Sequence, residues 1–336
     1  MRQLAVKIGL LAVSVLAALA LAEGILRATG FAFDIAPEAV EFGWPDPVVL
    51  EEHYAGDPDV FWVLKDYDLR LRRHAPRAPD IVFMGDSCTE FSEYPRLLLE
   101  RLSADPPERE IVGLKLAVGG WSSFQGLQQM KRDVVPLRPR VVTLYYGWND
   151  HWIGFGVEDK EVHRLTRWPL AGFREARLAQ LIFKGRLALL ARRSGDPPKR
   201  VTASDFRGNL GQIVALARQH GIVPVLLTAP TSHRSGSEPA RLGERWLTDR
   251  RELVPLHRAY VAIVREVAES ERAILCDLAA KFDEVPGEQR GDYFWDDGIH
   301  LSWKGTLKVS ELLYECFREV KELRSIWTGP EATSRH

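Results

Sequence analysis

Short apolar runs and amphipathic segments alternate along the chain from about residue 81 onward. The apolar runs, each the length of one strand, span 81–84, 111–118, 141–146, 222–227 and 273–276. Between them lie segments with helical spacing of apolar residues, among them 94–102, 206–220 and 256–269. Short apolar strands that alternate with helices are typical of a parallel sheet covered on both faces. The pattern therefore predicts an α/β fold with a doubly wound parallel sheet.

The N-terminus carries a different pattern, one long apolar stretch. Residues 8–22 contain no charge, Arg2 and Lys7 precede them, and Glu23 follows. This run is short for a bilayer span. Residues 4–6 extend it if Lys7 snorkels, and the helical pattern continues past Glu23. We therefore predict an uncleaved single-pass membrane anchor that leaves the rest of the chain on the extracytoplasmic side of the cell membrane.

Two other interpretations of this stretch stay open. A basic start followed by an apolar run also fits a secretory signal, and Ala20 and Ala22 before Glu23 could form its cleavage site. The protein would then be secreted after cleavage. The third interpretation is a buried helix. In both of the first two cases the remainder of the chain is exported.

The composition of the chain suggests a division into successive parts. The anchor covers 1–30, and a connecting arm rich in Pro, Asp and aromatic residues covers 31–78 and is expected to pack on the domain. The main domain covers 79–325, with a helical insertion at about 152–200, and a tail covers 326–336.

The insertion contains a basic segment with helical spacing, residues 174–193. Its positive residues, set against Glu175 alone, are Arg174, Arg177, Lys184, Arg186, Arg192 and Arg193. Such a helix can lie on an anionic membrane surface or form a lid over a pocket, and it can equally be an ordinary solvated helix. The sequence does not decide among these three roles for the helix.

Charge and cysteine content narrow the classes of partner. The 45 Lys and Arg residues almost balance the 46 Asp and Glu residues, so a nucleic-acid partner is not expected.

The chain has three cysteines, an odd number, and they are far apart: Cys88, Cys276 and Cys316. From these spacings we expect neither a disulfide framework nor a CxxC metal site. The oligomeric state stays open.

Four polar clusters follow or adjoin the predicted elements. "GDS" follows the first apolar run, "GGWSS" the second and "GWND" the third, and "FWDDGIHLSWKG" precedes the last helix. In open parallel sheets, ligands bind outside the carboxyl ends of the strands. We therefore expect the clusters to converge on one edge of the sheet.

Ser87, in "DIVFMGDSCTE", is the candidate nucleophile. It lies where a strand becomes a helix, so its hydroxyl is expected at the sheet edge, near the positive end of a helix dipole. A serine that only caps the helix would look the same locally.

His300 is the candidate general base, and Asp297 is the candidate carboxylate that orients it. In "DDGIH" the two lie three residues apart, and Gly298 allows the tight bend that would bring the carboxylate to the far ring nitrogen. Asp296 is the rival carboxylate. A structural histidine is one alternative, and a metal site is another, although the sequence offers no third ligand at a typical spacing.

Two residues are candidates for the oxyanion hole. Gly120 in "LAVGGWSS" allows its backbone N–H to approach a substrate, and Asn149 in "GWND" carries an amide that can donate. Each on its own could equally be a turn or cap residue.

The SGNH (GDSL-type) hydrolase superfamily carries four motifs in a fixed order: Gly-Asp-Ser, Gly, Gly-x-Asn-Asp and Asp-x-x-His. The main domain contains these motifs in the same order and resembles that family. The resemblance implies a three-layer α/β/α, flavodoxin-like fold and ester or acyl-transfer chemistry with neither a cofactor nor a metal. It implies the triad Ser87, Asp297 and His300. It also implies an oxyanion hole from the Ser87 amide, Gly120 and Asn149. The anchor and aromatic arm look similar to the membrane-anchored bacterial members.

Three positions depart from common patterns. In the family, Leu or a hydroxyl residue often follows the serine, whereas here Cys88 does. In the family, Asn often precedes the glycine of the second motif, whereas here Lys115 lies near that place. Thr89 takes the place of the second glycine of a GxSxG elbow, so the ordinary α/β-hydrolase arrangement is not expected.

Tryptophans crowd the polar clusters, and they bear on the substrate. Five of the ten in the chain lie there: Trp121, Trp148, Trp152, Trp295 and Trp303. Tryptophan near a site can stack on a sugar face or wall an acyl pocket, and it can also simply pack in the core.

The leading functional hypothesis is an envelope-anchored serine esterase that acts on an acylated glycan or lipid through an acyl-enzyme at Ser87. A close alternative is an O-acyltransferase that passes the acyl group to an envelope polysaccharide with the same triad. A third, from another class, is a non-catalytic envelope protein that binds a glycan or a partner.

Overall fold

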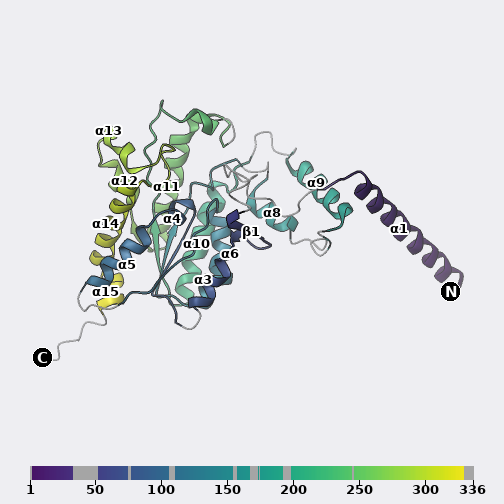
Figure 1. Cartoon of the computed structure of the whole chain (residues 1–336), viewed down its shortest axis with the longest axis horizontal. Helices are drawn as coiled ribbons and strands as arrows, with labels where there is room; N and C mark the ends of the chain where they lie inside the picture. Colours follow the sequence, from purple (N-terminus) through teal and green to yellow (C-terminus); the bar gives the residue numbers. More distant parts are fainter. Residues whose placement is uncertain are drawn as a thin grey trace.

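A five-stranded parallel sheet forms the centre of the protein (Figure 1). The computed structural model describes residues 2–32, 52–74, 77–105, 110–153, 157–166, 173, 175–191, 198–243 and 246–328. The strands are β3 (Ile81–Gly85), β4 (Gly113–Lys115), β5 (Val141–Tyr145), β6 (Val223–Leu227) and β7 (Ile274–Cys276). They lie in the order β4-β3-β5-β6-β7. The predicted α/β class with a doubly wound sheet is confirmed.

The strands form because their side chains are buried on both faces of the sheet. All five residues of β3 and all five of β5 are buried, and Ile81 pairs with Val141 in register. Along β3, Val82 and Met84 belong to one hydrophobic cluster, whereas Ile81 and Phe83 belong to the other. This alternation is the two-residue period of a strand that is covered on both sides.

Helices cover both faces, which makes the three layers. The helices α5 (Tyr94–Ala104), α12 (Leu278–Asp283) and α14 (Trp303–Glu319) pack on one face, and α6 (Ser123–Gln129), α10 (Ala203–Gln219) and α11 (Leu253–Ser270) pack mainly on the other (Figure 1). The remaining helices and turns are α3 (Tyr67–His74), α4 (Ser87–Glu90), η2 (Met130–Val134), α7 (Val135–Leu137), α8 (Asp159–Thr166), α9 (Arg177–Ala191), η4 (Ala240–Gly243), η5 (Arg250–Glu252), α13 (Gly287–Arg290), η6 (Gly291–Tyr293) and α15 (Lys321–Thr328).

The second apolar run, 111–118, forms a shorter strand than its length suggests. Only Gly113–Lys115 is regular, but the backbone N–H groups of Leu116 and Val118 still donate to the carbonyls of Phe83 and Gly85. The chain therefore continues alongside β3 and delivers the glycine-rich loop to the carboxyl edge of the sheet.

A hairpin that the sequence pattern did not predict lies within the arm. Strands β1 (Tyr54–Asp57) and β2 (Phe61–Leu64) pair antiparallel, and Phe61, Trp62 and Tyr67 are buried in the same cluster as Trp121. The arm was predicted to pack on the domain, and this part of it does contact the core. Residues 33–51 of the arm and 329–336 of the tail lie outside the described residues.

The N-terminal stretch is one continuous helix, α1 (Arg2–Ala28), which projects away from the domain in Figure 1. Residues Gln3–Ala28 are long and apolar enough to cross a membrane, and none of their best window is buried inside the protein. A membrane anchor and a signal sequence both have these properties.

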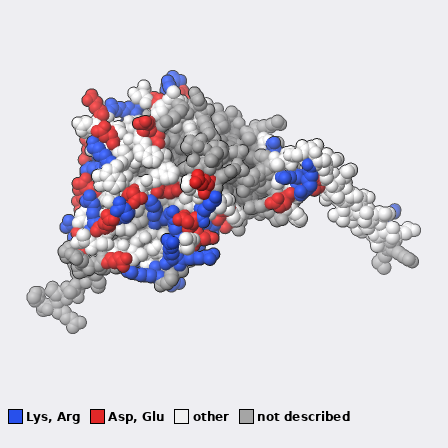
Figure 2. All heavy atoms as spheres, viewed as in Figure 1, with Lys and Arg blue, Asp and Glu red and all other residues white. Residues whose placement is uncertain are grey.

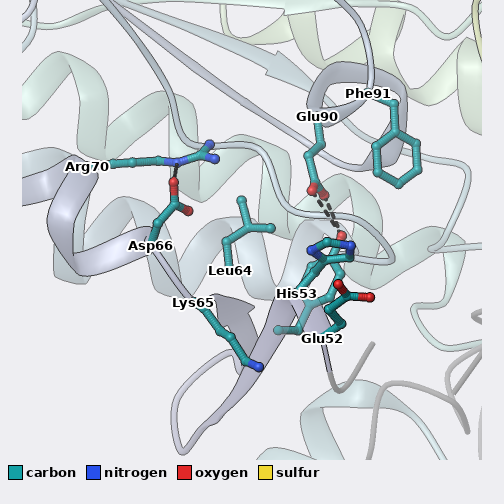
Figure 3. Close-up of a pocket in the computed structure, with 9 residues that line it drawn as sticks. Glu52, His53, Leu64, Lys65, Asp66, Arg70, Glu90 and Phe91 are labelled. Atoms are coloured by element: carbon teal, nitrogen blue, oxygen red, sulfur yellow. Dashed lines mark hydrogen bonds and ion pairs between the residues drawn. The ribbon is translucent and has the colours of Figure 1, made fainter. Parts of the chain in front are cut away.

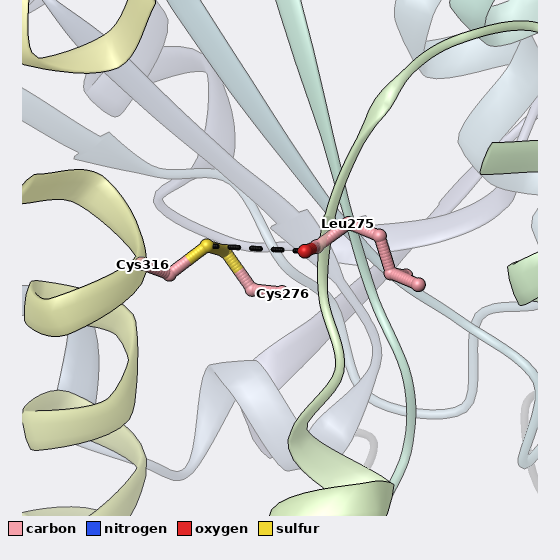
Figure 4. Close-up of a disulfide and its surroundings, with 3 residues drawn as sticks. All are labelled: Leu275, Cys276 and Cys316. Carbon is pink, nitrogen blue, oxygen red and sulfur yellow. Dashed lines mark hydrogen bonds between the residues drawn. A yellow bond between two sulfur atoms is a disulfide. The ribbon is translucent and has the colours of Figure 1, made fainter. Parts of the chain in front are cut away.

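Cys276 at the end of β7 and Cys316 on α14 form a disulfide, with their Cα atoms 5.9 Å apart (Figure 4). The cysteine spacing predicted no disulfide framework and did not reveal this single bond, because 40 residues of sequence separate two positions that the packing of α14 near β7 brings together. Cys88 is free and buried. Disulfides persist in oxidising compartments, which agrees with an exported domain.

We expect reduction of this disulfide to lower the free energy of unfolding by about 2–4 kcal/mol, since the bond restricts the unfolded chain. Urea denaturation with and without dithiothreitol measures the difference. The double variant Cys276→Ser/Cys316→Ser should be less stable and insensitive to reductant. A wild-type midpoint that does not change on reduction would contradict the prediction.

Candidate active site

The turn between β3 and α4 presents Ser87. Asp86 is the N-cap of α4, because its Oδ1 accepts a hydrogen bond of 2.9 Å from the backbone N–H of Cys88. Ser87 is thus the first residue of the helix, and the alternative in which Ser87 is itself the cap is wrong. A Cβ at Gly85 would come within 2.5 Å of Thr89 Oγ1, so glycine is required for this close turn.

Ser87, His300 and Asp297 form a continuous chain of hydrogen bonds. His300 Nε2 lies 2.8 Å from Ser87 Oγ, and His300 Nδ1 lies 2.5 Å from Asp297 Oδ2. The side chains of His300 and Asp297 are each 21% exposed, so the chain reaches solvent. A hydroxyl, an imidazole and a carboxylate in this order are the arrangement that acyl transfer through a serine requires.

The "DDGIH" turn aims Asp297 at the imidazole. Asp297 Oδ1 accepts hydrogen bonds from the backbone N–H groups of Ile299 (2.8 Å) and His300 (2.9 Å), which leaves Oδ2 for the ring. Burial raises the pKa of Asp297, but the bonds from His300 and the backbone outweigh burial and hold this pKa below its usual value. Asp296 is exposed. The carboxylate that contacts the imidazole is thus Asp297.

Two side chains of the loop that follows β6 contact the backbone carbonyls of this turn. His233 Nε2 lies 2.7 Å from the Asp297 carbonyl oxygen, and Thr231 Oγ1 donates to the Gly298 carbonyl at 3.0 Å. Gly298 has a φ of +72°, and a Cβ there would come within 2.6 Å of His233 Nε2. Sequence reasoning missed these residues. Their one signal is that they follow a predicted strand at its carboxyl end.

The glycine-rich loop places Gly120 in a left-handed conformation, with a φ of +76°. Arg200 Nη1 donates to the Gly120 carbonyl at 2.6 Å, which turns that oxygen away from solvent. Among the described residues, no acceptor receives a hydrogen bond from the backbone N–H of Ser87 or of Gly120. Both N–H groups are therefore available as oxyanion donors.

Asn149 lies at the end of β5 and is buried. Its Nδ2 lies 3.1 Å from the Trp121 carbonyl and 3.3 Å from Asp86 Oδ2, so the amide hydrogens are held between the second polar cluster and the serine turn. The structure thus brings all the predicted site residues to one edge of the sheet: Ser87, Gly120, Asn149, Asp297 and His300.

A buried ion pair supports the glycine-rich loop. Arg200 Nη2 lies 2.9 Å from Asp159 Oδ2, and both side chains are fully buried. The same guanidinium donates to Gln125 Oε1, and Ser122 Oγ donates to Asp159. Sequence reasoning missed this network because charged residues in a helical insertion are expected to face water.

The arm contacts the same loop from the other side. The Glu90 carboxylate accepts hydrogen bonds from the Gly119 N–H and, at 2.8 Å, from the Tyr54 hydroxyl. Trp62 Nε1 donates to the Gly119 carbonyl at 2.9 Å. Burial raises the pKa of Glu90. Trp62 of the hairpin therefore holds the Gly119 carbonyl, and Glu90 of α4, which Tyr54 of the hairpin contacts, holds the Gly119 N–H.

Two buried carboxylates lie behind the site. Burial raises the pKa of Asp86 to about 6 and that of Asp150 to about 7. Asp150 Oδ1 accepts from the Ser123 backbone at 2.9 Å and its hydroxyl at 2.5 Å, while Oδ2 has no partner within the described chain. These features fit a carboxyl group at Asp150 that keeps its proton up to about neutral pH.

The tryptophans near the motifs divide into two groups. Trp121, Trp148 and Trp152 are buried and pack in the core, whereas Trp295 is 48% exposed and Trp303 is 58% exposed. Core packing thus accounts for three of the five.

Trp295 belongs to an aromatic pair beside the His300 imidazole. The rings of Phe91 and Trp295 lie 6.2 Å apart at 15°, and their centroids lie 5.6 Å and 5.1 Å from that of His300. Phe91 is 42% exposed. Two exposed, nearly parallel rings next to His300 form an apolar surface that a substrate can contact.

A hollow of about 470 Å³ adjoins this aromatic pair (Figure 3). Most of the residues that line it are of polar or charged types, although the larger part of the lining surface is apolar, and they come from the arm, α3 and α4: Glu52, His53, Tyr54, Leu64, Lys65, Asp66, Arg70, Glu90 and Phe91. The figure shows Glu90 and Phe91 leaving neighbouring positions of one turn. The Glu90 carboxylate accepts a hydrogen bond of 2.8 Å from the Tyr54 hydroxyl. Phe91 is therefore shared by the hollow and the aromatic pair.

No cluster of three or more His, Cys, Asp or Glu side chains that could hold a metal ion occurs in the part of the chain that the structure describes.

The chain matches the model of the GDSL-like lipase/acylhydrolase family over residues 83–306, more than half of its length, and belongs to that family. This membership makes it an ester-bond hydrolase by class. No curated protein matches the chain.

Solved structures with a similar fold include three bacterial proteins. A lipase/acylhydrolase from Enterococcus faecalis is 18% identical with a TM-score of 0.47, and covers 72% of this chain and 96% of its own. A GDSL-like lipase from Bacteroides thetaiotaomicron is 16% identical with a TM-score of 0.46, covering 76% and 98%. A variant of an acetyl xylan esterase from Geobacillus stearothermophilus is 17% identical with a TM-score of 0.46, covering 72% and 93%.

The two neighbouring carboxylates at the turn give a matched test. We expect Asp297→Asn to reduce kcat on p-nitrophenyl acetate by about 10⁴-fold, because the imidazole loses the partner that fixes its tautomer. Asp296→Asn removes an exposed carboxylate with the same charge and should leave kcat almost unchanged. A larger loss in the Asp296 variant than in the Asp297 variant would show that the assignment is wrong.

Proposed function

We propose that the protein is a serine esterase that works through an acyl-enzyme on Ser87. The observation that carries the proposal is the chain of hydrogen bonds from Asp297 through His300 to Ser87. In the first step Ser87 Oγ bonds to the ester carbonyl carbon and its proton passes to His300 Nε2. The alcohol then leaves with that proton. Water next bonds to the acyl carbon and gives a proton to His300, and His300 passes that proton to Ser87 Oγ as the bond to the acyl carbon breaks and the acid leaves.

The tetrahedral intermediate carries a negative oxygen, and three donors are proposed to stabilise it. They are the backbone N–H groups of Ser87 and Gly120 and the side-chain amide of Asn149. Both hydrogens of the Asn149 amide have acceptors, Trp121 and Asp86, so this side chain must release one of them to donate to the oxyanion. The support for the other two donors is that the N–H groups of Ser87 and Gly120 have no other acceptor in the described chain. Such donors stabilise the transition state because they need no reorganisation when the charge develops.

Two alternatives share parts of this site. An O-acyltransferase to an envelope polysaccharide would use the same triad and differ only in replacing water by a sugar hydroxyl. A non-catalytic binding protein would have no need of an aligned serine, imidazole and carboxylate, so the triad geometry favours the two enzymes.

We propose that the enzyme acts on the extracytoplasmic side of the cell membrane, anchored by α1. Support comes from the long apolar helix and from the Cys276–Cys316 disulfide, which is stable in oxidising surroundings. Secretion after cleavage before Glu23 is the alternative.

The substrate is proposed to be an acylated glycan, with an acylated lipid as the alternative. An exposed pair of rings, Phe91 and Trp295, can stack on the apolar face of a sugar, and the charged lining of the adjoining hollow can bind hydroxyl groups. A hydrocarbon chain would not use the charged groups.

We expect a fluorophosphonate probe to form a covalent adduct on Ser87, because the activated hydroxyl attacks the phosphorus. Mass spectrometry of the digested protein locates the adduct. Ser87→Ala should abolish both the adduct and hydrolysis of p-nitrophenyl acetate, whereas Ser92→Ala, at the other end of the same turn, should not. An adduct elsewhere, or retained hydrolysis in Ser87→Ala, would refute the nucleophile.

A second test concerns the aromatic surface. Trp295→Ala should lower kcat/KM on chemically acetylated xylotetraose by about three- to tenfold, the value of one lost stacking contact, and change p-nitrophenyl acetate hydrolysis little. Trp303→Ala is the matched control, since Trp303 is exposed but makes no ring contact with another described residue. Equal losses on both substrates, or a selective loss on p-nitrophenyl palmitate, would contradict a glycan substrate.

A further inference from the structure

The glycine-rich loop makes a tight turn at Gly119 and Gly120. The backbone N–H of Trp121 donates to the Val118 carbonyl at 3.2 Å, which closes a four-residue turn. The φ of Gly120 is +76°, whereas the φ of Gly119 is not positive. A β-turn with a positive φ at its third residue alone is of type II. The proposed oxyanion donor, the Gly120 N–H, therefore belongs to the central peptide of this turn.

The central peptide of a β-turn can rotate as a unit. Between types I and II, ψ of the second residue changes from about −30° to about +120°, and φ of the third changes from about −90° to about +80°. A side chain at the third residue disfavours type II, but glycine adopts either form. With glycine at both central positions, the local sequence does not determine the direction of the Gly120 N–H.

Trp62 of the hairpin holds this peptide in one of its two orientations. Its Nε1 donates to the Gly119 carbonyl at 2.9 Å. The Gly119 carbonyl and the Gly120 N–H belong to one planar trans peptide, so they point in opposite directions. A donor fixed on the carbonyl therefore fixes the direction of the N–H. It also polarises the peptide, which makes the N–H a stronger donor.

Trp62 is itself fixed relative to the turn. It is only 3% exposed, and its carbonyl accepts a hydrogen bond of 2.9 Å from Trp121 Nε1. The hairpin and the turn thus exchange two hydrogen bonds through their tryptophans. The Arg200 guanidinium, which donates to the Gly120 carbonyl, lies 5.8 Å from the centre of the Trp62 ring. The indole therefore packs against the same group that holds the next peptide of the turn.

The backbone just before Trp62 is strained. Phe61 has a φ of +71°, and the Trp62 N–H donates across it to the Val60 carbonyl at 2.9 Å. A bulky side chain rarely adopts this left-handed conformation. The Phe61 ring is buried and stacks on Phe124, with the ring centres 6.1 Å apart. Strain of this kind persists only where the surrounding structure enforces it, and it is concentrated at functional positions.

We infer that Trp62 is a positioning residue for the oxyanion hole, because its indole N–H selects the orientation of the central peptide in which the Gly120 N–H is the oxyanion donor. Without this bond the peptide can rotate, and a carbonyl oxygen that repels the oxyanion takes the place of the N–H. The inference rests on the proposed function, since it needs that donor. It gives a role in the reaction to the arm, which lies outside the residues 83–306 that match the family model.

The test is Trp62→Phe in the full-length protein, which keeps an aromatic ring and removes the donor. We expect kcat on p-nitrophenyl acetate, expressed per Ser87 titrated by the fluorophosphonate probe, to fall by about 10- to 100-fold. This is less than the roughly 10²–10³-fold loss for a donor removed altogether, because the peptide still visits the productive orientation. KM should change little, since the donor acts on charge that develops in the transition state.

Surface charge does not complicate this comparison. Figure 2 shows Lys and Arg mixed with Asp and Glu over the visible face of the domain. The substitution changes no charge and the ester is neutral, so attraction of the substrate should be the same in both proteins.

A mimic of the oxyanion gives a second measurement. The carbonyl carbon of trifluoroacetone bonds to Ser87 Oγ, the hydroxyl proton passes to His300, and the hemiketal carries a negative oxygen. In Trp62→Phe its inhibition constant should rise by the same factor by which kcat/KM falls, because both report stabilisation of that oxygen.

Two further variants complete the test. Tyr67→Phe removes a buried hydroxyl of the arm that donates to Asp133 at 2.8 Å, so it should lower the thermal midpoint and leave kcat unchanged. Benzothienylalanine at position 62 replaces the indole N–H by sulfur in a ring of the same shape. It should reproduce the loss in Trp62→Phe, and it tests the donor alone if that variant does not fold.

Wild-type kcat in either variant at position 62 would overturn the inference. So would a loss of kcat with unchanged trifluoroacetone inhibition, or an equal loss in Tyr67→Phe, which would indicate general destabilisation of the arm. Failure of the proposed function gives a different result: the wild-type protein would form no adduct on Ser87, or Ser87→Ala would keep its activity.

Discussion

The hydrogen bond between His300 and Ser87 joins two segments from opposite ends of the domain, and the rest of the structure serves to hold its 2.8 Å distance. Ser87 is placed by a short buried strand and the cap of α4, both local to it. His300 lies outside the sheet, on a turn that is closed by an isolated antiparallel bridge between Phe294 and Leu301. Its position depends on the Asp297 carboxylate, on the clamp from His233 and on the packing of α14 against α5.

The glycine-rich loop, whose Gly120 N–H we propose as an oxyanion donor, shows the same dependence on distant supports. A preorganised donor is useful only if it cannot relax toward other partners, which requires the loop to be held on both sides. Arg200 holds the Gly120 carbonyl from the insertion side, and Glu90 holds the Gly119 N–H together with Tyr54 from the arm. Segments that look peripheral to the family motifs therefore complete the site, and the arm links it to the membrane helix.

The apolar helix α1 bears on the environment that we propose for the site. The helix α1 leaves the domain next to α9, and the Cys276–Cys316 bond ties the last strand to the helix that follows His300. The proposed export and anchoring agree with the disulfide, because disulfides persist in oxidising surroundings outside the cytosol. A substrate would then be part of the envelope or a molecule close to it.

The sequence by itself determined the sheet, the order of the motifs and the residues that meet at the sheet edge, because buried strands and turn glycines depend on local pattern. It also determined that Asp297, spaced three residues from His300, could reach the ring. Only the tertiary structure decided which charges are buried, such as Arg200 with Asp159, and which cysteines pair. It also decided that Trp295 is exposed while Trp148 is not. These outcomes depend on distances between segments that are far apart in the chain. The packing of the whole domain sets those distances, and no local sequence pattern encodes them.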